Sequence, residues 1–286
     1  MSWFARLRRR LADAPWQLWT SQLISVLRIE MRKNFWMRRS IWIYLLAFGP
    51  AATVGLRALL ERAYVSMIPD DTQVLALIFQ IYYLHLGIFF GCMGLFSWLF
   101  RGEVVEKTLH YYFLAPMRRE LVVIGKFLAG VTASTVLFGL GVLLSFTFMY
   151  AHFGAAGRAF VFDGPGLGHL LSYLGVTALA CIGYGSLFLA LSLVFKNPIL
   201  PGIVVLLWET FHAVLPALLQ KLSIMFYLKQ LCPVSIPPEG VLVLFTVVAE
   251  PVPGWIAVPG LLGLCSVILL FACLRIRQTE ISYLAD

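Results

Sequence analysis

Residues 127–150 read FLAGVTASTVLFGLGVLLSFTFMY, an apolar stretch without a single charged side chain. A helix needs about 20 residues to cross about 30 Å of hydrocarbon, so this stretch is long enough to span a bilayer. It is predicted to be helical, because an open strand in lipid would leave its backbone N–H and C=O groups without hydrogen-bond partners. The stretch therefore predicts a membrane-spanning helix.

Further apolar runs of similar length lie on both sides of this one. The composition agrees, because 60% of the 286 residues are hydrophobic and only 13% are charged. Soluble globular domains have about 45–50% apolar and about 25% charged residues, so this chain falls outside that class. We predict an all-α integral membrane protein with six transmembrane helices, at Ile41–Leu60, Val74–Phe100, Phe127–Tyr150, Leu170–Phe195, Ile199–Leu219 and Trp255–Leu274.

Residues 220–254, before the last run, contain only one short apolar stretch, Val241–Ala249. A helix of that length reaches only about 13 Å, so the stretch cannot cross the bilayer. Prolines bracket it on both sides, at Pro233, Pro237, Pro238, Pro251 and Pro253. We expect a re-entrant or interfacial hairpin on the outer side of the membrane.

Basic residues are concentrated on one side of this topology. Residues 1–40, 101–126, Lys196 and residues 275–286 carry a net charge of +10, and the rest of the chain carries −2, within a total of +8. Because Lys and Arg collect in cytoplasmic segments, both termini and residues 101–126 are predicted to be cytoplasmic. The basic composition is thus interpreted as membrane orientation, and no nucleic acid is expected as a partner.

Residues 1–40 precede the transmembrane domain of residues 41–286 and are predicted to form an amphipathic helix. Basic residues, including Arg28 and Arg32, lie away from an apolar stripe and suit a helix lying flat among lipid head groups. A basic helix that binds another protein or nucleic acid is the alternative interpretation. The stripe consists of apolar residues at steps of three and four: Trp16, Trp19, Leu23, Leu27, Met31 and Phe35.

Residues 101–126 join the second and third predicted spans and read RGEVVEKTLHYYFLAPMRRELVVIGK. They carry charges of both signs and are too few for a catalytic domain. Pro116 ends one helix, since the residue before a proline disfavours the α conformation. Arg118, Arg119 and Glu120 are placed to begin the next helix. We predict a short helix–turn–helix elbow that contacts a partner.

This segment resembles the one between the second and third helices of ABC-2 type transporter permeases. It departs from the family pattern at Lys107, where Gly is common, and at His110 and Tyr111, where an acidic residue is usual. The resemblance extends over nearly the whole chain, through the interfacial helix, the six spans and the irregular outer region. The matching positions are Glu103, Glu106, Thr108, Leu109, Ala115, Pro116, Arg118, Arg119, Glu120, Gly125 and Lys126.

The resemblance implies the permease subunit of an exporter in the bacterial plasma (inner) membrane. Two permease subunits, identical or related, would form the translocation pathway, and two copies of a separate ABC ATPase would hold ATP and Mg²⁺. The chain itself would not be an enzyme and would bind no cofactor. Membrane lipids would surround it. The residues implied in coupling to the ATPase are Glu103, Glu106, Thr108, Leu109, Pro116, Arg118, Arg119 and Glu120.

The chain contains no phosphate-binding loop of the form Gly-x-x-x-x-Gly-Lys-[Ser/Thr]. Gly125 and Lys126 are followed by Phe127, and the position of the earlier glycine is occupied by Glu120. A loop of this kind needs glycines so that its backbone N–H groups can surround the phosphates. An ATPase that drives this chain must therefore be a separate polypeptide.

Polar residues inside the predicted spans are candidates for the translocation pathway: Glu209 and His212 in the fifth span, and Gln80 and Tyr83 in the second. A charged group at that depth is costly and usually faces the bundle interior or a wet cavity. Glu209 and His212 would line the substrate route or form a proton-sensitive gate. Alternatively, a neutral Glu209 holds a neighbouring helix by hydrogen bonds. For Gln80 and Tyr83 the alternative to a pathway role is that their side chains are packed in the bundle interior.

No metal site is expected. Glu103, Glu106 and His110 share one face of a helix, but no second cluster of His or Cys completes a set of ligands. Two other function classes remain as alternatives. A membrane enzyme acting on lipid-like substrates requires an acidic cluster at a membrane face, to which Asp70 and Asp71 come nearest. A secondary transporter requires an inverted repeat and several intramembrane charges.

Overall fold

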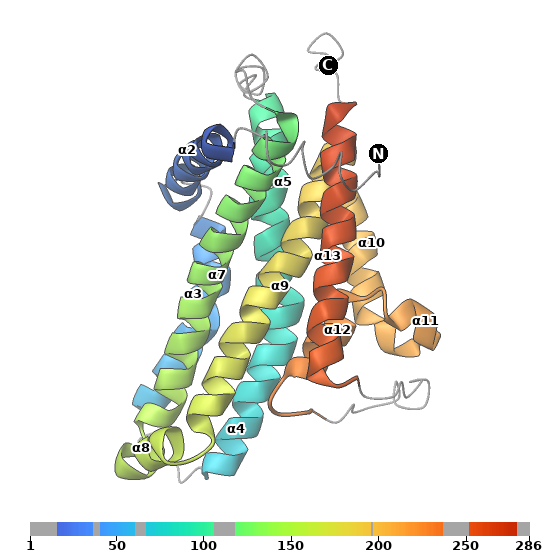
Figure 1. Ribbon diagram of the computed structural model, residues 1–286. Coiled ribbons are helices and arrows are strands. Elements are labelled where there is room, and N and C mark those ends of the chain that lie inside the picture. Colours follow the sequence, from blue (N-terminus) through green and yellow to red (C-terminus); the bar gives the residue numbers. More distant parts are fainter. Residues whose placement is uncertain are drawn as a thin grey trace.

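The computed structural model describes residues 16–36, 41–60, 67–105, 118–195, 197–236 and 252–278. Every regular element within these ranges is helical, which confirms the predicted all-α class (Figure 1). The elements are α2 (Trp16–Trp36), α3 (Ile41–Leu60), α4 (Ile68–Leu77), the π-helix η2 (Ile78–Ile88), α5 (Phe89–Val105), α7 (Arg119–Ala151), α8 (Gly154–Phe162), α9 (Gly166–Val194), α10 (Ile199–Thr210), the 3₁₀-helix η3 (His212–Val214), α11 (Ala217–Gln220), α12 (Ile224–Leu231) and α13 (Gly254–Arg277).

Most of the predicted spans are helices of membrane-spanning length. In the described part of the chain, five helical segments are long and apolar enough to cross a bilayer. They correspond to five of the six predicted runs, within one residue where a run is not wholly included, and extend several of them at one or both ends. The segments are Ile41–Leu59, Ile68–Glu103, Arg119–Ala151, Gly166–Val194 and Gly254–Arg277.

The prediction of one continuous helix over Ile199–Leu219 is wrong. Helix α10 has 12 residues and ends at Thr210, and it reaches only about 18 Å at a rise of about 1.5 Å per residue. The 3₁₀ turn and the short helix α11 follow it. Residues 220–254 contain α12, whereas the predicted short stretch Val241–Ala249 lies outside the described residues.

The second span changes its helix type midway. α4 passes directly into η2, an 11-residue π-helix, and η2 passes into α5. A π-helix is wider than an α-helix and is usually short, and it is often found at functional sites. Both polar candidates of this span, Gln80 and Tyr83, lie in η2 and are buried.

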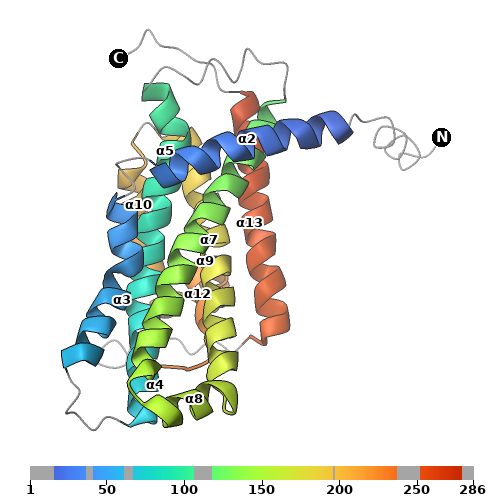
Figure 2. The same cartoon turned by 90° about the vertical axis from the view of Figure 1, so that its left-hand side faces the viewer.

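Helices α7 and α9 form the centre of a bundle in which α3, α5 and α13 pack around them (Figure 1). α2 lies crosswise at one end, here called the α2 end, and α4 and α8 lie at the other, called the α8 end (Figure 2). α9 runs toward the α2 end, whereas α13 begins nearer the α8 end and also runs to the α2 end. The core is rich in buried aromatic side chains, including Phe79, Phe89, Phe96, Phe138, Tyr184 and Phe188.

Helices α3 and α7 approach each other closely at Gly141. A Cβ atom at this position would overlap the backbone carbonyl oxygen of Ala47, which cannot move without moving α3. We expect Gly141→Ala to lower the free energy of unfolding by about 1–3 kcal/mol, as overpacking of a core does. The measurement is the thermal unfolding midpoint of the protein purified in detergent.

Gly139→Ala is the matched control for this prediction. Gly139 lies in the same helix, and a Cβ there would be 3.7 Å from Leu174 Cδ2, an ordinary contact. Its replacement should leave stability unchanged or raise it by up to about 1 kcal/mol, because alanine favours the helix. Equal effects of the two substitutions would contradict the close approach of α3 and α7.

Candidate functional site

Four charged side chains form an ion cluster at the α2 end: Glu30 and Lys33 of α2, Glu103 of α5, and Lys126 of α7. Lys126 Nζ lies 2.7 Å from Glu30 Oε1 and 2.8 Å from Glu103 Oε1. Lys33 Nζ lies 3.1 Å from Glu103 Oε1 and 3.7 Å from Glu30 Oε1. The formal charges of the two lysines and two glutamates balance, and the cluster joins three helices.

Lys126 is the buried centre of the ion cluster. Its side chain is 0% exposed, whereas that of Lys33 is 41% exposed. Besides the two carboxylates, Lys126 Nζ donates a hydrogen bond to the Leu99 carbonyl oxygen at 3.0 Å. An ammonium group has three N–H donors, and these three acceptors satisfy all of them. This complete pairing offsets the cost of removing a charge from water.

Helix α2 lies directly against the first turns of α7. A Cβ at Gly125 would lie 2.8 Å from Val26 Cγ1, so only glycine allows this approach without a shift of the Val26 side chain. The Arg118 guanidinium carbon lies 4.4 Å from the centre of the Trp19 ring, a cation–π contact. Val26 and Glu30 are the buried centre of the face of α2 that packs on α7.

The predicted stripe on α2 lies beside this buried centre. A Cβ at Gly125 would lie 3.6 Å from Leu23 Cδ1, and Leu27 is half-buried. Arg28 and Arg32 are exposed, away from the bundle. Trp16 is the first residue of α2; the positions of its side chain and that of Phe35 lie outside the described part.

The start of α7 is also fastened to the end of α13. Arg119 Nη1 donates to the carbonyl oxygens of Ile276 at 3.5 Å and Arg277 at 3.3 Å. Glu120 forms an ion pair with Arg277. The last carbonyl groups of a helix have no partners within it, and a cation there is stabilising. Arg119 and Glu120 thus hold the last transmembrane helix beside the third.

The structure describes half of the predicted coupling residues. Each of these four contacts another helix of the same chain. Glu103 belongs to the ion cluster, Arg118 contacts α2, and Arg119 and Glu120 contact α13. The other four lie outside the described residues: Glu106, Thr108, Leu109 and Pro116.

Sequence reasoning missed Glu30 and Lys33 and gave Lys126 no role beyond the family resemblance. A signal was present, since Glu30 lies next to an apolar stripe and Lys126 directly precedes a long apolar run. Each charge sits where burial is expected, and buried charges require partners. Periodicity alone does not say which charges pair, because the partners lie on three separate helices.

Glu209 holds together the break between α10 and α12. Its side chain is buried, and Oε2 accepts hydrogen bonds from Ser223 Oγ at 2.7 Å and from the Met225 backbone N–H at 2.9 Å. Oε1 accepts from the Ile224 backbone N–H at 3.0 Å. The first N–H groups of a helix have no partners within it, and an anion there is stabilising. Glu209 supplies those partners for the first two N–H groups of α12, those of Ile224 and Met225.

His212 belongs to the same break. It is buried, and its Nδ1 atom donates to the Glu209 carbonyl oxygen at 2.7 Å. The pathway candidates of the fifth span thus lie together. Gln80 of η2 reaches the segment after α12, where Nε2 donates to the Val234 carbonyl oxygen at 2.8 Å.

Tyr83 belongs to a different network. Its hydroxyl group donates to the Ala47 carbonyl oxygen of α3 at 3.2 Å and shares a hydrogen bond with Ser145 Oγ of α7 at 2.9 Å. The ring is 1% exposed. Tyr83 therefore links the second span to α3 and α7, away from the hydrogen bonds of Glu209.

A second charged group lies at the α8 end. Asp71 is buried, and its carboxylate oxygens lie 3.8 Å from Arg57 Nη2 and 3.5 Å from His152 Nε2. Asp70, its neighbour in the sequence, is exposed. Among the described residues no group of three or more His, Cys, Asp or Glu side chains is arranged to hold a metal ion. Glu106 and His110 lie outside those residues.

The ion cluster and the Glu209 site act on different parts of the molecule. The ion cluster joins α2, α5 and α7, and the Glu209 site stabilises a break in a helix. Neither was visible as a spaced motif, because each joins residues from separate segments. No protein-family model matches the chain, and no curated protein matches it.

Proposed function

We propose that this chain is the membrane subunit of an ABC-2 type exporter in a bacterial plasma membrane. Two such subunits, identical or related, enclose the translocation pathway. A separate ABC ATPase, in two copies, binds at the α2 end and holds ATP and Mg²⁺. The proposal starts from the resemblance of residues 101–126, and the ion cluster is the structural observation that supports it most.

The ion cluster includes both ends of the proposed coupling segment, residues 101–126. Glu103 lies near the start of this segment and Lys126 is its last residue, and Glu30 of α2 binds Lys126. A displacement of the coupling segment would therefore move α2, α5 and α7 together. Arg119 and Glu120 extend this connection to α13. These connections make the α2 end of the bundle one rigid unit. A rigid unit of this kind is required if the closing movement of the ATPase is to move the transmembrane helices.

The proposed topology has six crossings. α9 runs to the α2 end and α13 begins nearer the α8 end (Figure 1), so the chain between them crosses the bundle once more. α10, α11 and α12 supply this sixth crossing as a broken helix. Irregular backbone at membrane depth is tolerated where it is buried in protein, and Glu209 satisfies the N–H groups exposed by the break.

The orientation follows from charge and from the exposed face of α2. With six crossings both termini lie on the side of the α2 end, where the positive charge is concentrated. Ile24 and Ile29 of α2 are exposed together with Arg28 and Arg32. Apolar side chains beside cations suit a helix at the cytoplasmic boundary between lipid and water.

Co-purification tests the proposal. A tagged copy of the chain, extracted from its native membrane, should retain a soluble ATPase in stoichiometric amount. We expect Glu106→Arg to reduce the retained ATPase at least several-fold, because it reverses a charge in the segment proposed to contact that partner. The readouts are quantitative mass spectrometry of the eluate and its ATP hydrolysis rate.

Asp163→Arg is the matched control, since it makes the same charge change in an exposed residue at the α8 end. It should leave ATPase retention unchanged. Reproducible absence of an ATPase from the unmodified complex would overturn the proposal. Equal loss in both variants would show that the interaction does not depend on the coupling segment.

A further inference from the structure

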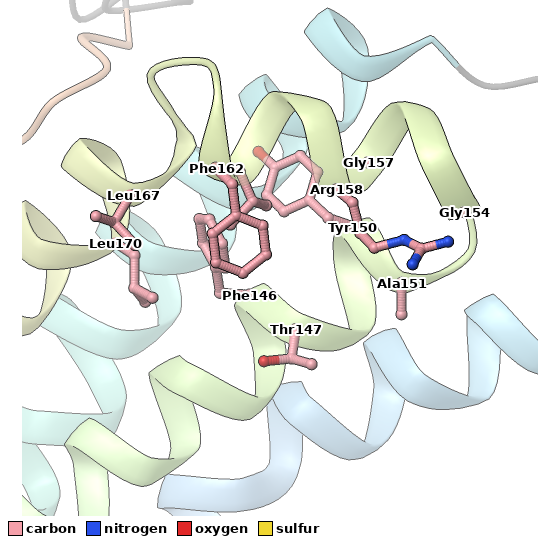
Figure 3. Close-up of a pocket in the computed structure, with 11 residues that line it drawn as sticks. Phe146, Thr147, Tyr150, Ala151, Gly154, Gly157, Arg158, Phe162, Leu167 and Leu170 are labelled. Atoms are coloured by element: carbon pink, nitrogen blue, oxygen red, sulfur yellow. The ribbon is translucent and has the colours of Figure 1, made fainter.

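An apolar pocket of about 630 Å³ opens at the α8 end, where α8 connects α7 to α9 (Figure 3). Ligand pockets in proteins commonly have volumes of about 300–1,000 Å³, so the volume of this pocket is in the range of pockets that bind organic molecules. Its walls come from three helices and include Phe146, Tyr150, Val161, Phe162, Leu167 and Leu170.

The walls of the pocket are fixed by packing. Gly154 has a φ of 57°, a left-handed conformation that suits glycine and turns the chain from α7 into α8. Gly157 lies so close to the Tyr150 carbonyl oxygen that a Cβ would overlap it. The ring centroids of Phe160 and Tyr150 lie 5.0 Å apart. The Tyr150 hydroxyl group and Thr72 Oγ1 of α4 share a hydrogen bond of 2.9 Å. The shape of the pocket is thus determined by the packing and backbone conformation of the residues around it.

One cationic side chain, Arg158, lines this otherwise apolar pocket. Arg158 is exposed, and in the described part of the chain no carboxylate forms an ion pair with it. Figure 3 shows the guanidinium group extending away from the aromatic rings of Phe146 and Phe162. A guanidinium group matches the geometry of a phosphate, to which it can donate two parallel hydrogen bonds.

The position of the pocket indicates the surroundings of its occupant. It lies at the ends of α7 and α9, two helices long and apolar enough to cross a bilayer. The ends of such helices are where the boundary between lipid and water is expected. Phe162 and Leu171 beside it are 74% and 61% exposed. Large exposed apolar side chains at this level are stable in contact with hydrocarbon.

We propose that this pocket binds a phospholipid with an anionic head group. An acyl chain occupies the apolar walls, and the phosphate-containing head group lies against Arg158. The charge of Arg158 and the apolar lining are complementary to the two ends of this molecule. The site is separate from the ion cluster and from Glu209, and the proposal does not depend on exporter function.

Lipid titration of the delipidated protein tests the proposal. Native mass spectrometry with added phosphatidylglycerol or phosphatidylcholine gives an apparent Kd for each lipid. We expect the unmodified protein to prefer phosphatidylglycerol. Arg158→Gln should weaken phosphatidylglycerol binding about tenfold, in line with the loss of a charge-assisted hydrogen bond. It should weaken phosphatidylcholine binding less, because the choline cation offsets the charge of the phosphate, so the preference for phosphatidylglycerol should shrink. Arg158→Lys should restore part of the preference.

Two further variants separate the pocket from the general lipid surface. Thr147→Phe adds a ring at the pocket wall and should weaken binding of both lipids. Lys221→Gln removes an exposed cation outside the pocket and should change neither affinity. Unchanged phosphatidylglycerol binding in Arg158→Gln, which alters only an exposed side chain, would overturn the proposal. Equal affinity of the unmodified protein for both lipids would do the same.

Discussion

Lys126→Met is expected to lower the free energy of unfolding by about 3–5 kcal/mol, the cost of removing one partner from a buried ion pair. The substitution leaves Glu30 and Glu103 close together and buried, and among the ion pairs of the described residues they keep Lys33, whose side chain is 41% exposed. It also removes the donor to the Leu99 carbonyl oxygen. The measurement is reversible unfolding by SDS in mixed micelles, followed by circular dichroism.

Lys33→Met is the matched control for Lys126→Met. It removes a lysine of the same cluster whose side chain is 41% exposed, and exposed ion pairs contribute only about 0–1 kcal/mol. Glu30→Gln combined with Glu103→Gln should recover part of the stability lost in Lys126→Met, because it removes the two buried negative charges that Lys126 no longer balances. Equal destabilisation by the two lysine substitutions would contradict the central position of Lys126.

Glu209→Leu is expected to destabilise the protein by roughly 3 kcal/mol or more. It removes the acceptor for three donors, the Ser223 hydroxyl group and the N–H groups of Ile224 and Met225, and each unsatisfied buried donor costs about 1–3 kcal/mol. Glu209→Gln should have an intermediate effect, because its amide oxygen still accepts while its NH₂ group faces a donor. SDS unfolding measures both variants.

Thr210→Val is the control for the Glu209 variants. Thr210 is the exposed neighbour of Glu209, and its hydroxyl group donates only to the Leu206 carbonyl oxygen of its own helix. Its substitution should change stability by less than about 1 kcal/mol. A Glu209→Leu variant as stable as Thr210→Val would show that the carboxylate does not hold the break together.

The Glu209 variants also separate the two interpretations of this residue. Three hydrogen bonds to the start of α12 support the structural interpretation, in which a loss of stability accompanies any loss of transport. A substrate-route or gating role predicts instead that Glu209→Gln assembles normally and lowers substrate-stimulated ATP hydrolysis. Normal stability with reduced turnover would favour that role, and unchanged transport would exclude it.

The apolar runs alone predicted a helical chain and all five segments of spanning length, together with a sixth, Ile199–Leu219, that is not one continuous helix. Phe127–Tyr150 lies wholly within α7, and Leu170–Phe195 overlaps α9 except at its last residue. This information is local, because each span needs only enough consecutive apolar residues and a backbone that bonds to itself. The apolar stripe on residues 16–36 likewise predicted α2.

The tertiary structure decided which charges are buried together and where a helix breaks. The run Ile199–Leu219 is apolar throughout most of its length, yet α10 ends at Thr210 because Glu209 binds the start of α12, more than ten residues later. Lys126, Glu103 and Glu30 meet only because α2 folds across α7 at Gly125. Hydrophobic periodicity depends only on which residues of one segment face lipid, water or protein. A buried charge is stable only with partners, and the tertiary fold brings these partners to it from other segments.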